Sequence, residues 1–267
     1  MKTEVFTDKN NITAFKKIKL LILYVKNWYM IIPDKLNLIS EIKYRTIQDQ
    51  TFICRSKSTD INEVVAIVSD AEYPESFIQL NDDDVVLDLG ANIGSFTIYC
   101  NSVNKNVNYK GYAFEPFSKN FEILKKNCKL NSVKKFSLLR TAVSNMNGTV
   151  YMDIDCLPDS VSIIDENKGT LPIKSTKLST FCRLKKIKSV SLIKMDIEGS
   201  EYSLLEVDLQ FLTNHVKRII FEYHNLNSVY NKKWIVKKLS QNFKLTKIYD
   251  AEGYGVLYAE NKKIFRS

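Results

Sequence analysis

Residues 85–95 read Val85-Val86-Leu87-Asp88-Leu89-Gly90-Ala91-Asn92-Ile93-Gly94-Ser95. The stretch opens with a continuous apolar run, which is typical of a strand buried on both faces of a sheet. Two glycines then lead into a helical pattern over 94–103, in a chain with only 8 glycines among 267 residues. Glycine at such a turn lets the backbone approach a ligand, and the free amides of the helix N-terminus face an anionic group. The stretch therefore predicts a ligand-binding turn; a purely structural tight turn is the alternative.

A second acidic residue lies where an adenosine ligand would need it. Glu115 ends a predicted strand over 111–115, 27 residues after Asp88. In a sheet wound this way the carboxyl ends of the two strands are neighbours, so Glu115 can reach the hydroxyls of a ribose. The glycine spacing is G-x-x-x-G, which differs from the dinucleotide fingerprint G-x-G-x-x-G. The pattern favours S-adenosylmethionine over a nicotinamide dinucleotide as the cofactor.

The chain from residue 84 onward alternates between predicted strands and helices, which indicates a parallel sheet covered on both faces. We expect strands over 111–115, 136–140, 190–195 and 217–223, further strands over 148–154 and 171–178, and helices over 118–131 and 228–241. The last two strands, 243–249 and 253–259, are joined only by the turn from Asp250 to Gly253. Such a short connection makes this closing pair antiparallel, because a parallel pair needs a long crossover.

Residues 1–80 are predicted to form an accessory region in front of a cofactor-binding domain over 81–267. We expect a helix over 12–31 that stops before Pro33, a hairpin of strands 41–47 and 51–55, and a second helix. Asp60 is the expected N-cap of that second helix, with Glu63 three residues later as in a capping box. The apolar stretch 20–32 follows several lysines and is too short to span a bilayer. We expect it to pack on the domain; peripheral contact of residues 12–32 with a membrane surface is the alternative.

Composition places the chain among ordinary globular proteins, with 45% apolar and 26% charged residues. It excludes collagen-like, low-complexity and strongly disordered chains. The net charge of +9 comes from 39 basic and 30 acidic residues, and we interpret the lysine clusters as exposed surfaces rather than a nucleic-acid site. The five cysteines are odd in number, and none stands at C-x-x-C or zinc spacing. They favour reduced thiols in a cytoplasmic protein; they are Cys54, Cys100, Cys128, Cys156 and Cys182.

A third acidic cluster follows the predicted strand over 190–195. Asp196 stands at the carboxyl end of that strand, where ligands bind in open α/β sheets. Glu198 and Glu201 come at the start of the next helix, where the helix dipole favours negative charge. We place Asp196 and Glu198 in the site, and we interpret Glu201 as a helix-capping residue with an ion pair to Lys194.

One of the two histidines is the candidate catalytic base. His224 lies just past the strand over 217–223, and Glu222 stands two residues earlier, on the same side of that strand. His224 is the expected general base and Glu222 the residue that orients it or the substrate; a strand-end histidine that merely forms hydrogen bonds is the alternative. His215 is expected to be structural. A divalent metal between Asp196 and Glu222 is a further alternative, but we expect a site without metal.

The three motifs together resemble the FkbM family of methyltransferases. The resemblance covers roughly residues 40–260, and Leu178-Ser179-Thr180-Phe181 departs from the Leu-Asp-Asp often found in the family. It implies a class I methyltransferase (Rossmann-like) fold with a seven-stranded, mostly parallel sheet and an antiparallel closing strand, S-adenosylmethionine as cofactor, and O-methylation of a hydroxyl on a sugar, glycan or small natural product. It also implies roles for the first two motifs: Asp88, Gly90, Asn92 and Gly94, with Ser95 beside them, at the methionine end of the cofactor, and Glu115 at the ribose.

Two other functions stay open at this point. An RNA ribose methyltransferase fits the same motifs, whereas methylation of a base amino group does not, because no Pro-Pro motif follows the fourth strand. A non-catalytic module that binds a nucleotide-like ligand or a membrane surface is the second alternative. The sequence does not identify the methyl acceptor or the oligomeric state.

The predicted base gives a first test. We expect His224→Ala to lower the rate of methyl transfer while binding of S-adenosylmethionine survives, because a base acts on the acceptor and not on the cofactor. Turnover is measured with labelled cofactor and binding by calorimetry. Unchanged turnover in this variant would remove His224 from the mechanism.

Overall fold

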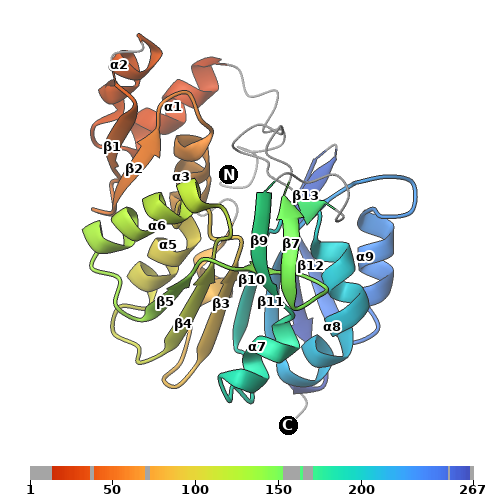
Figure 1. The fold of residues 1–267 in the computed structure, drawn as a ribbon. Coiled ribbons are helices and arrows are strands. Elements are labelled where there is room, and N and C mark those ends of the chain that lie inside the picture. The colour runs from red at the N-terminus through yellow and green to blue at the C-terminus, as the bar shows by residue number, and fades with distance from the viewer. Residues whose placement is uncertain are drawn as a thin grey trace.

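A twisted sheet of seven strands forms the centre of the computed structural model, which describes residues 14–36, 39–69, 73–152, 163–164, 171–251 and 253–264 (Figure 1). Its strands are β3 (Val85–Leu89), β4 (Lys110–Phe114), β5 (Phe136–Leu139), β10 (Leu192–Met195), β11 (Arg218–His224), β12 (Phe243–Asp250) and β13 (Tyr254–Asn261). The strand order is β12-β13-β11-β10-β3-β4-β5. Strands β11, β10, β3, β4 and β5 are parallel, and β13 runs antiparallel to both of its neighbours. The predicted fold and its antiparallel closing pair are confirmed.

The chain changes direction across the sheet at β3. It proceeds from β3 to β4 and β5 on one side, and later returns to β10 and β11 on the other. Ligands of open α/β sheets bind outside the carboxyl ends of the strands at such a switch point. The candidate site is therefore expected where β3 and β10 end.

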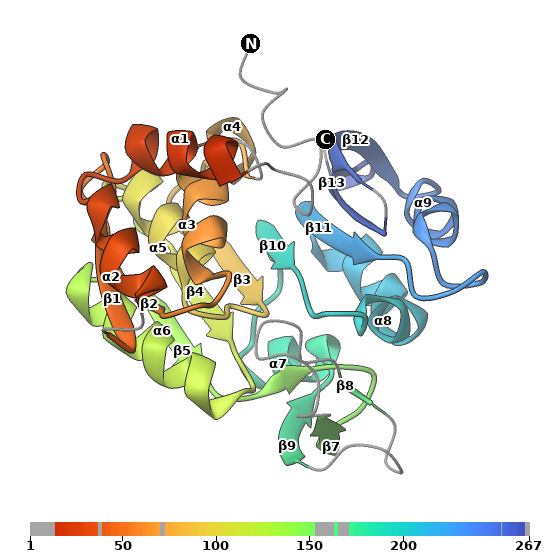
Figure 2. The same cartoon turned by 90° about the horizontal axis from the view of Figure 1, so that it is seen from above.

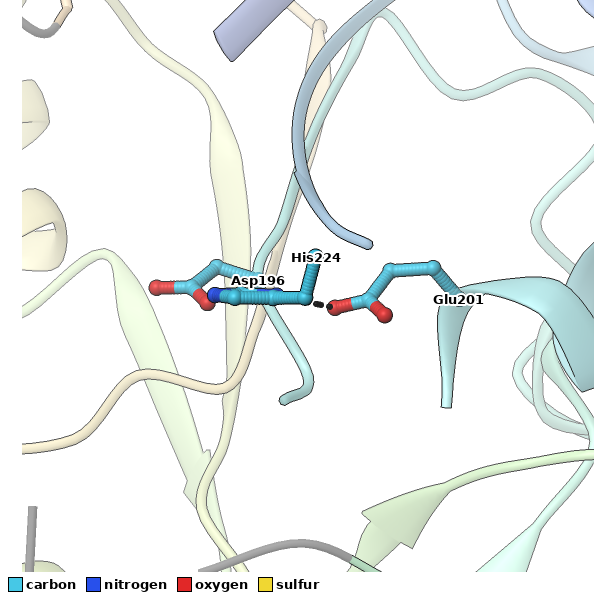
Figure 3. A group of neighbouring side chains, drawn as sticks. All are labelled: Asp196, Glu201 and His224. Carbon is cyan, nitrogen blue, oxygen red and sulfur yellow. Dashed lines mark ion pairs between the residues drawn. The ribbon is translucent and has the colours of Figure 1, made fainter. Parts of the chain in front are cut away.

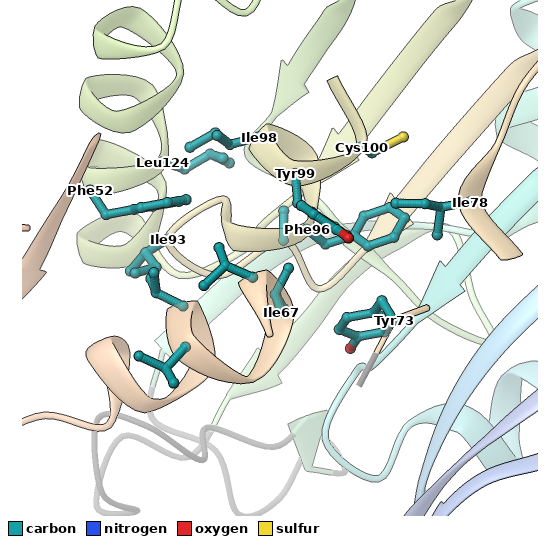
Figure 4. Close-up of a cluster of buried hydrophobic side chains, with 14 of the residues drawn as sticks. Phe52, Ile67, Tyr73, Ile78, Ile93, Phe96, Ile98, Tyr99, Cys100 and Leu124 are labelled. Carbon is teal, nitrogen blue, oxygen red and sulfur yellow. The ribbon is translucent and has the colours of Figure 1, made fainter. Parts of the chain in front are cut away.

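Helices cover both faces of the sheet (Figure 2). The helices on one face are α3 (Asp60–Val68), α4 (Glu75–Ile78), α5 (Ser95–Val103) and α6 (Ser118–Leu130), and those on the other are α7 (Leu178–Leu184), α8 (Glu201–His215) and α9 (Lys232–Leu239). Alternate residues of β3 point to opposite faces, so Val86 enters one core cluster while Leu87 and Leu89 enter the other. Figure 4 shows side chains of β2 (Thr51–Arg55), α3, α5 and α6 meeting in the first cluster.

A small second sheet follows β5. Its strands are β6 (Ala142–Val143), β7 (Gly148–Met152), β8 (Ile163–Ile164) and β9 (Leu171–Thr176), in the order β6-β9-β7-β8. The extra strands predicted over 148–154 and 171–178 are thus found over 148–152 and 171–176. Residues 153–154, and the predicted loop with Asp155, Pro158 and Asp159, lie outside the described residues. The short strand β6 and the helix α7 were not predicted.

The N-terminal helix is shorter than the sequence predicts. α1 (Ala14–Tyr24) is followed by the single-turn η1 (Trp28–Met30) and by α2 (Ile31–Lys35). The chain leaves the helix because the side chain of Asn27 binds the backbone of β1 (Glu41–Arg45), where it accepts the N–H of Arg45 and donates to the carbonyl of Lys43. Pro33 lies inside α2, in the first turn, where the missing N–H of proline costs no helical hydrogen bond.

The predicted capping box at Asp60 is wrong. Thr59 is the N-cap of α3 and Asp60 is its first residue, and the side chain of Thr59 makes no capping hydrogen bond. The hydroxyl of Ser58 accepts the N–H of Asp60 at 3.2 Å. The carboxylate of Asp60 instead accepts two hydrogen bonds from the guanidinium of Arg55, of 2.9 and 2.6 Å. It also accepts the backbone N–H of Arg55. A bidentate arginine is a stronger partner than the amides of the first helical turn.

Two asparagines of α6 attach the N-terminal hairpin, β1 and β2, to the sheet domain. The side chain of Asn127 accepts the N–H of Ile53 at 2.7 Å and donates to the carbonyl of the same residue at 3.1 Å. Asn131, one turn later, makes the same pair of bonds with the N–H and carbonyl of Thr51, at 2.9 and 2.7 Å. The two amides satisfy the edge of β2 as a neighbouring strand would. The predicted hairpin is confirmed, and the boundary near residue 80 stays a prediction.

The outer surface of the N-terminal helices is apolar in places. Ile22, Leu23, Tyr29 and Ile32 are each about half exposed. None of the described helices is both long and apolar enough to cross a membrane. Peripheral membrane contact through residues 12–32 stays a prediction.

The cysteines add no cross-link among the described residues. Four are buried free thiols, and Cys156 lies outside the described residues. Burial raises the pKa of the Cys100, Cys128 and Cys182 thiols to about 12, so these thiols stay protonated. They act as small apolar side chains of the core.

Asn127→Ala tests how the hairpin is attached. The variant leaves the N–H and carbonyl of Ile53 without their partner, and it also removes a bond to the carbonyl of Ile93. We expect the free energy of unfolding to fall by about 3 kcal/mol, measured by urea denaturation. Lys129→Ala, at an exposed position of the same helix, is the control and should change it by less than about 0.5 kcal/mol. Equal stability of the two variants would contradict this account.

Candidate active site

The glycine turn after β3 brings two strand ends together. Gly90 has a φ of +78°, and a Cβ placed there would lie 1.7 Å from the backbone oxygen of Asp196. Gly94 has a φ of +93°, and its Cβ would lie 2.6 Å from Cδ1 of Leu124. Any side chain at Gly90 would force the ends of β3 and β10 apart, because the atom it would meet belongs to the backbone. At Gly94 the positive φ is the constraint, since the end of the Leu124 side chain can move aside. The predicted turn from strand to helix is therefore present and requires both glycines.

Glu115 is held in place by the backbone on either side of it. One carboxylate oxygen accepts the N–H of Asn92 at 2.8 Å, and the other accepts the N–H of Phe117 at 2.9 Å. Burial raises the pKa of Glu115 to about 7, although these two amides lower it. The carboxylate is thus fixed at the end of β4, beside the glycine turn.

Two adjoining cavities open at the carboxyl ends of β3 and β10. Glu63, Gly90, Asn92, Asp196 and Glu198 line both of them. The first, with an open volume of about 680 Å³, is lined in addition by Phe114, Glu115, Pro116, Phe117, Asn120, Thr141, Ala142, Val143, Met152 and Ile197. The second, of about 480 Å³, is also lined by Ile67, Tyr73, Ala91, Ser95, Phe96, Lys194 and Glu222.

A buried lysine joins the two strands below these cavities. Lys194 of β10 stands directly across from Asp88 of β3, and its Nζ lies 3.7 Å from Oδ1 of Asp88. The same Nζ lies 3.3 Å from Asp196 and donates to the carbonyl of Gly90 at 2.6 Å. Burial alone would lower the pKa of Lys194, but the two aspartates outweigh it and raise that pKa. Thr97 adds a hydrogen bond of 2.5 Å to the other oxygen of Asp88.

Glu198 occupies an unusual backbone position in the turn after β10. Its φ is +50°, and that of Gly199 is +91°. Positive φ values are uncommon for residues other than glycine, and among those found in the described part of the chain Asn92 and Glu198 are the ones that line the cavities. The side chain of Glu198 is 37% exposed, and burial together with the charge of Asp196 raises its pKa to about 7. Glu198 therefore places a carboxyl group that ionises near neutral pH against both cavities.

Carboxylates face both ring nitrogens of His224. Nδ1 lies 3.5 Å from Oε1 of Glu201, and Nε2 lies 3.7 Å from Oε2 of Glu198 and 3.9 Å from Oε1 of Glu222. Figure 3 shows the imidazole with the carboxylates of Asp196 and Glu201 on either side. Burial would lower the pKa of His224, but Glu201 and the other carboxylates outweigh it and raise that pKa to about 10. The ring is therefore a cation at neutral pH unless another positive charge displaces its proton.

The structure brings all the predicted site residues to one edge of the sheet, but only some of them line a cavity. Gly90, Asn92, Ser95, Glu115, Asp196, Glu198 and Glu222 do so, whereas Asp88, Gly94 and His224 lie behind the lining. Asp88 supports the turn through Lys194 and Thr97. His224 lies behind Glu198. Their direct contact with cofactor or acceptor stays a prediction. His215 has a structural place, with Nδ1 near the carbonyl of Lys188 and its ring stacked on Phe211.

Three site residues were missed or misread in the sequence. Glu63, in the accessory region, lines both cavities and accepts two hydrogen bonds from the side-chain amide of Asn92. Lys194 pairs with Asp88 and Asp196, and not with Glu201 as expected. Glu201 does accept the N–H of Ile197 at 3.0 Å, as a capping residue would, but its carboxylate also faces His224. A lysine in an otherwise apolar buried strand was the signal that could have identified Lys194.

Comparison with known proteins agrees with the predicted family. The family model described as the methyltransferase FkbM domain matches residues 88–245. The hexuronic acid methyltransferase AglP of Haloferax volcanii is 26% identical over 163 residues, which are 61% of this chain and 64% of that protein. The match therefore spans less than two thirds of the relative's own length.

Two solved structures are similar in fold. A methyltransferase FkbM from Methylobacillus flagellatus KT has a TM-score of 0.47 and 14% identity, over 74% of this chain and 52% of that one. TYW2 from M. jannaschii, solved in complex with AdoMet, has a TM-score of 0.46 and 15% identity, over 83% of this chain and 85% of that one. Both scores lie below 0.5, so the fold described above rests on the strand order of this chain alone.

Lys194→Met tests the charge balance below the cavities. The variant leaves the fully buried carboxylate of Asp88 without its ammonium partner. Removing one partner of a buried pair costs about 3–5 kcal/mol in the free energy of unfolding, and urea denaturation measures that loss. Lys185→Met, at an exposed position, is the control and should be nearly neutral. A loss no larger than that of the control would contradict a central role for Lys194.

Proposed function

We propose, from the premise that this chain belongs to the FkbM family of methyltransferases, that it methylates a hydroxyl group of a sugar or glycan. The chain is a methyltransferase with a Rossmann-like fold, and S-adenosylmethionine is its cofactor. What we propose beyond this is that the methyl group goes to an oxygen atom and that the acceptor is a sugar or glycan. A sugar as the acceptor class is supported by the relative named as a hexuronic acid methyltransferase, which is similar over 61% of this chain. The acidic lining of the two cavities departs from the charged sugar in that name and favours a neutral one.

The first cavity suits the adenosine part of the cofactor. Glu115 lies at its wall with both oxygens fixed by backbone amides, so the remaining lone pairs are available to ribose hydroxyls. Phe117, Val143 and Met152 give the same cavity an apolar surface for a flat aromatic base.

The second cavity suits the methionine part. The hydroxyl of Ser95 is buried there and has no hydrogen-bond partner within the described part of the chain, so it is available to a ligand. The carboxylates of Asp196, Glu198 and Glu222 also line this cavity and favour a positively charged group. When bound, S-adenosylmethionine supplies a methyl group on a positively charged sulfur.

Glu198 is the residue best placed to take the proton from the acceptor hydroxyl. It lines both cavities, and part of its side chain is open to solvent. In the proposed transfer the hydroxyl oxygen would gain the methyl group as the bond between that carbon and the sulfonium sulfur breaks and leaves a neutral thioether. The O–H bond would break, and the proton would pass to the carboxylate of Glu198. His224, predicted from the sequence as the base, lies behind Glu198 with Nε2 3.7 Å from its carboxylate, and we propose that it holds Glu198 in position. Asp196 and Glu222 complete the acidic wall that faces the reacting atoms.

The charge of the lining favours a neutral acceptor. Five carboxylates line the two cavities among the described residues, namely Glu63, Glu115, Asp196, Glu198 and Glu222. The ammonium of Lys194 already pairs with Asp88 and Asp196. A phosphate or a free carboxylate would be repelled by this lining, so a neutral sugar hydroxyl fits it better than an RNA backbone.

The acceptor class is tested by methyl transfer from labelled S-adenosylmethionine to fractionated cell extract. We expect label in the glycan or sugar fraction, at a hydroxyl that becomes a methyl ether. Transfer of the label only to RNA, protein or lipid would overturn the proposal. Pure neutral hexoses and the matching uronic acids, compared at equal concentration, test the predicted preference for an uncharged acceptor.

Glu198→Gln tests the proton acceptor. The amide keeps the size of the side chain but cannot take the proton, so kcat should fall by about 100-fold or more. The Kd of S-adenosylmethionine, measured by calorimetry, should change far less than kcat. Glu206→Gln, an exposed glutamate on α8, is the matched control and should keep wild-type kcat. Wild-type turnover in Glu198→Gln would exclude Glu198 as the base.

A further inference from the structure

Three side chains from different elements converge behind Glu198. Asp196 follows β10, Glu201 begins α8, and His224 ends β11. Each of them offers one ligand atom, and these atoms all lie within 4.8 Å of one another (Figure 3). Metal-ligand bonds of about 2.0–2.2 Å place neighbouring ligand atoms about 3–4 Å apart. Nδ1 of His224 and Oε1 of Glu201, which are 3.5 Å apart, already have that separation, and a small movement of the side chains would bring all three onto a single ion.

One carboxylate oxygen of Glu201 is buried without a hydrogen-bond partner in the described part of the chain. The residue is completely buried. Its Oε1 accepts the N–H of Ile197, but its Oε2 is buried without a hydrogen-bond partner in the described part of the chain. A buried carboxylate oxygen with no donor is costly. The oxygen that faces His224 is Oε1, which lies 3.5 Å from an Nδ1 that is also buried without a hydrogen-bond partner among the described residues. An ion bound by both oxygens of Glu201 would satisfy Oε2 and meet this nitrogen.

The surrounding charge also favours a cation. Four carboxylates lie around the His224 ring, those of Asp196, Glu198, Glu201 and Glu222. The positive groups that face them are the imidazole itself and Lys194, which is already shared between Asp88 and Asp196. An excess of buried negative charge is unfavourable unless a cation compensates for it.

We propose that Asp196, Glu201 and His224 bind a divalent transition-metal ion. Imidazole suits zinc and iron, and carboxylates suit manganese and magnesium, so this mixed set is suited to Mn²⁺, Fe²⁺ or Zn²⁺. The proposal departs from the metal-free site expected from the sequence, and it replaces the sequence-based alternative of Asp196 with Glu222.

The place of the ion also connects it to the acceptor. Asp196 lines both cavities, so an ion bound to it would lie next to the space that the acceptor hydroxyl is proposed to enter. A metal ion lowers the pKa of an oxygen that coordinates it. This consequence rests on the proposed function, whereas the binding of the ion does not.

The test is a titration of the full chain with Mn²⁺ after treatment with EDTA and desalting. Free Mn²⁺ is followed by its electron paramagnetic resonance signal, and neither methyl donor nor acceptor is present. We expect one ion per chain, with binding complete below about 1 mM. Glu201→Gln and His224→Ala should each weaken the affinity by about tenfold or more. Glu206→Gln, on the same helix but bonded to Tyr230, should bind Mn²⁺ like the wild type.

Because Glu201 is buried, the Mn²⁺ affinity of Glu201→Gln is compared with that of the wild type only if the two proteins unfold at similar temperatures. Asp196→Asn, whose side chain is 25% exposed, is the second variant and should also weaken binding by about tenfold or more. Absence of binding up to about 1 mM Mn²⁺, or wild-type affinity in Asp196→Asn and His224→Ala, overturns the metal site. Failure of this test leaves the proposed methyl transfer intact, since that is measured separately on sugar fractions.

Discussion

The ammonium group of Lys194 is the charge around which the edge of the sheet is organised. It lies buried between β10 and β3, opposite Asp88, and it also contacts Asp196 and the carbonyl of Gly90. Asp88 belongs to β3, Asp196 directly follows β10, and Gly90 lies in the turn that leads from β3 to α5. A lysine is retained at such depth only when it is fully paired. The ion pair therefore fixes the two strand ends at the close distance that Gly90 permits.

The cavities follow from that distance. With no side chain on Gly90, the backbone of Asp196 can approach the turn, and the turn then places the N–H of Asn92 against Glu115. The side chain of Asn92 reaches in the opposite direction to Glu63 of α3, so the N-terminal elements complete the wall of the site. Through Glu63, the N-terminal part of the chain thus lines the two cavities as well as covering one face of the sheet.

The fold was largely predictable because most of its helices, strands and turns are determined by residues that are close together in the sequence. Apolar runs, the glycine turn and the short final connection each determine their element through neighbours in the sequence. The missed contacts join residues that are distant in the chain. Glu63 lies 29 residues from Asn92, and Glu201 lies 23 residues before His224, so neither pairing leaves a mark in the local pattern. Asp60 was misread for a different reason, because Arg55, at the end of the preceding strand, takes up its carboxylate in place of the helix amides.

The backbone of the turn after β10, which carries Glu198, is supported by hydrogen bonds from neighbouring elements. Glu198 and Gly199 both have positive φ values, an arrangement that needs support from its surroundings. Glu201 supplies part of it through the N–H of Ile197, and Tyr202 donates to the backbone carbonyl of His224 at 2.7 Å. The first turn of α8 is thereby attached both to the loop that carries Glu198 and to the strand that carries His224. These attachments hold the backbone that carries Glu198, so the base that we propose there would lose little backbone entropy when an acceptor arrives.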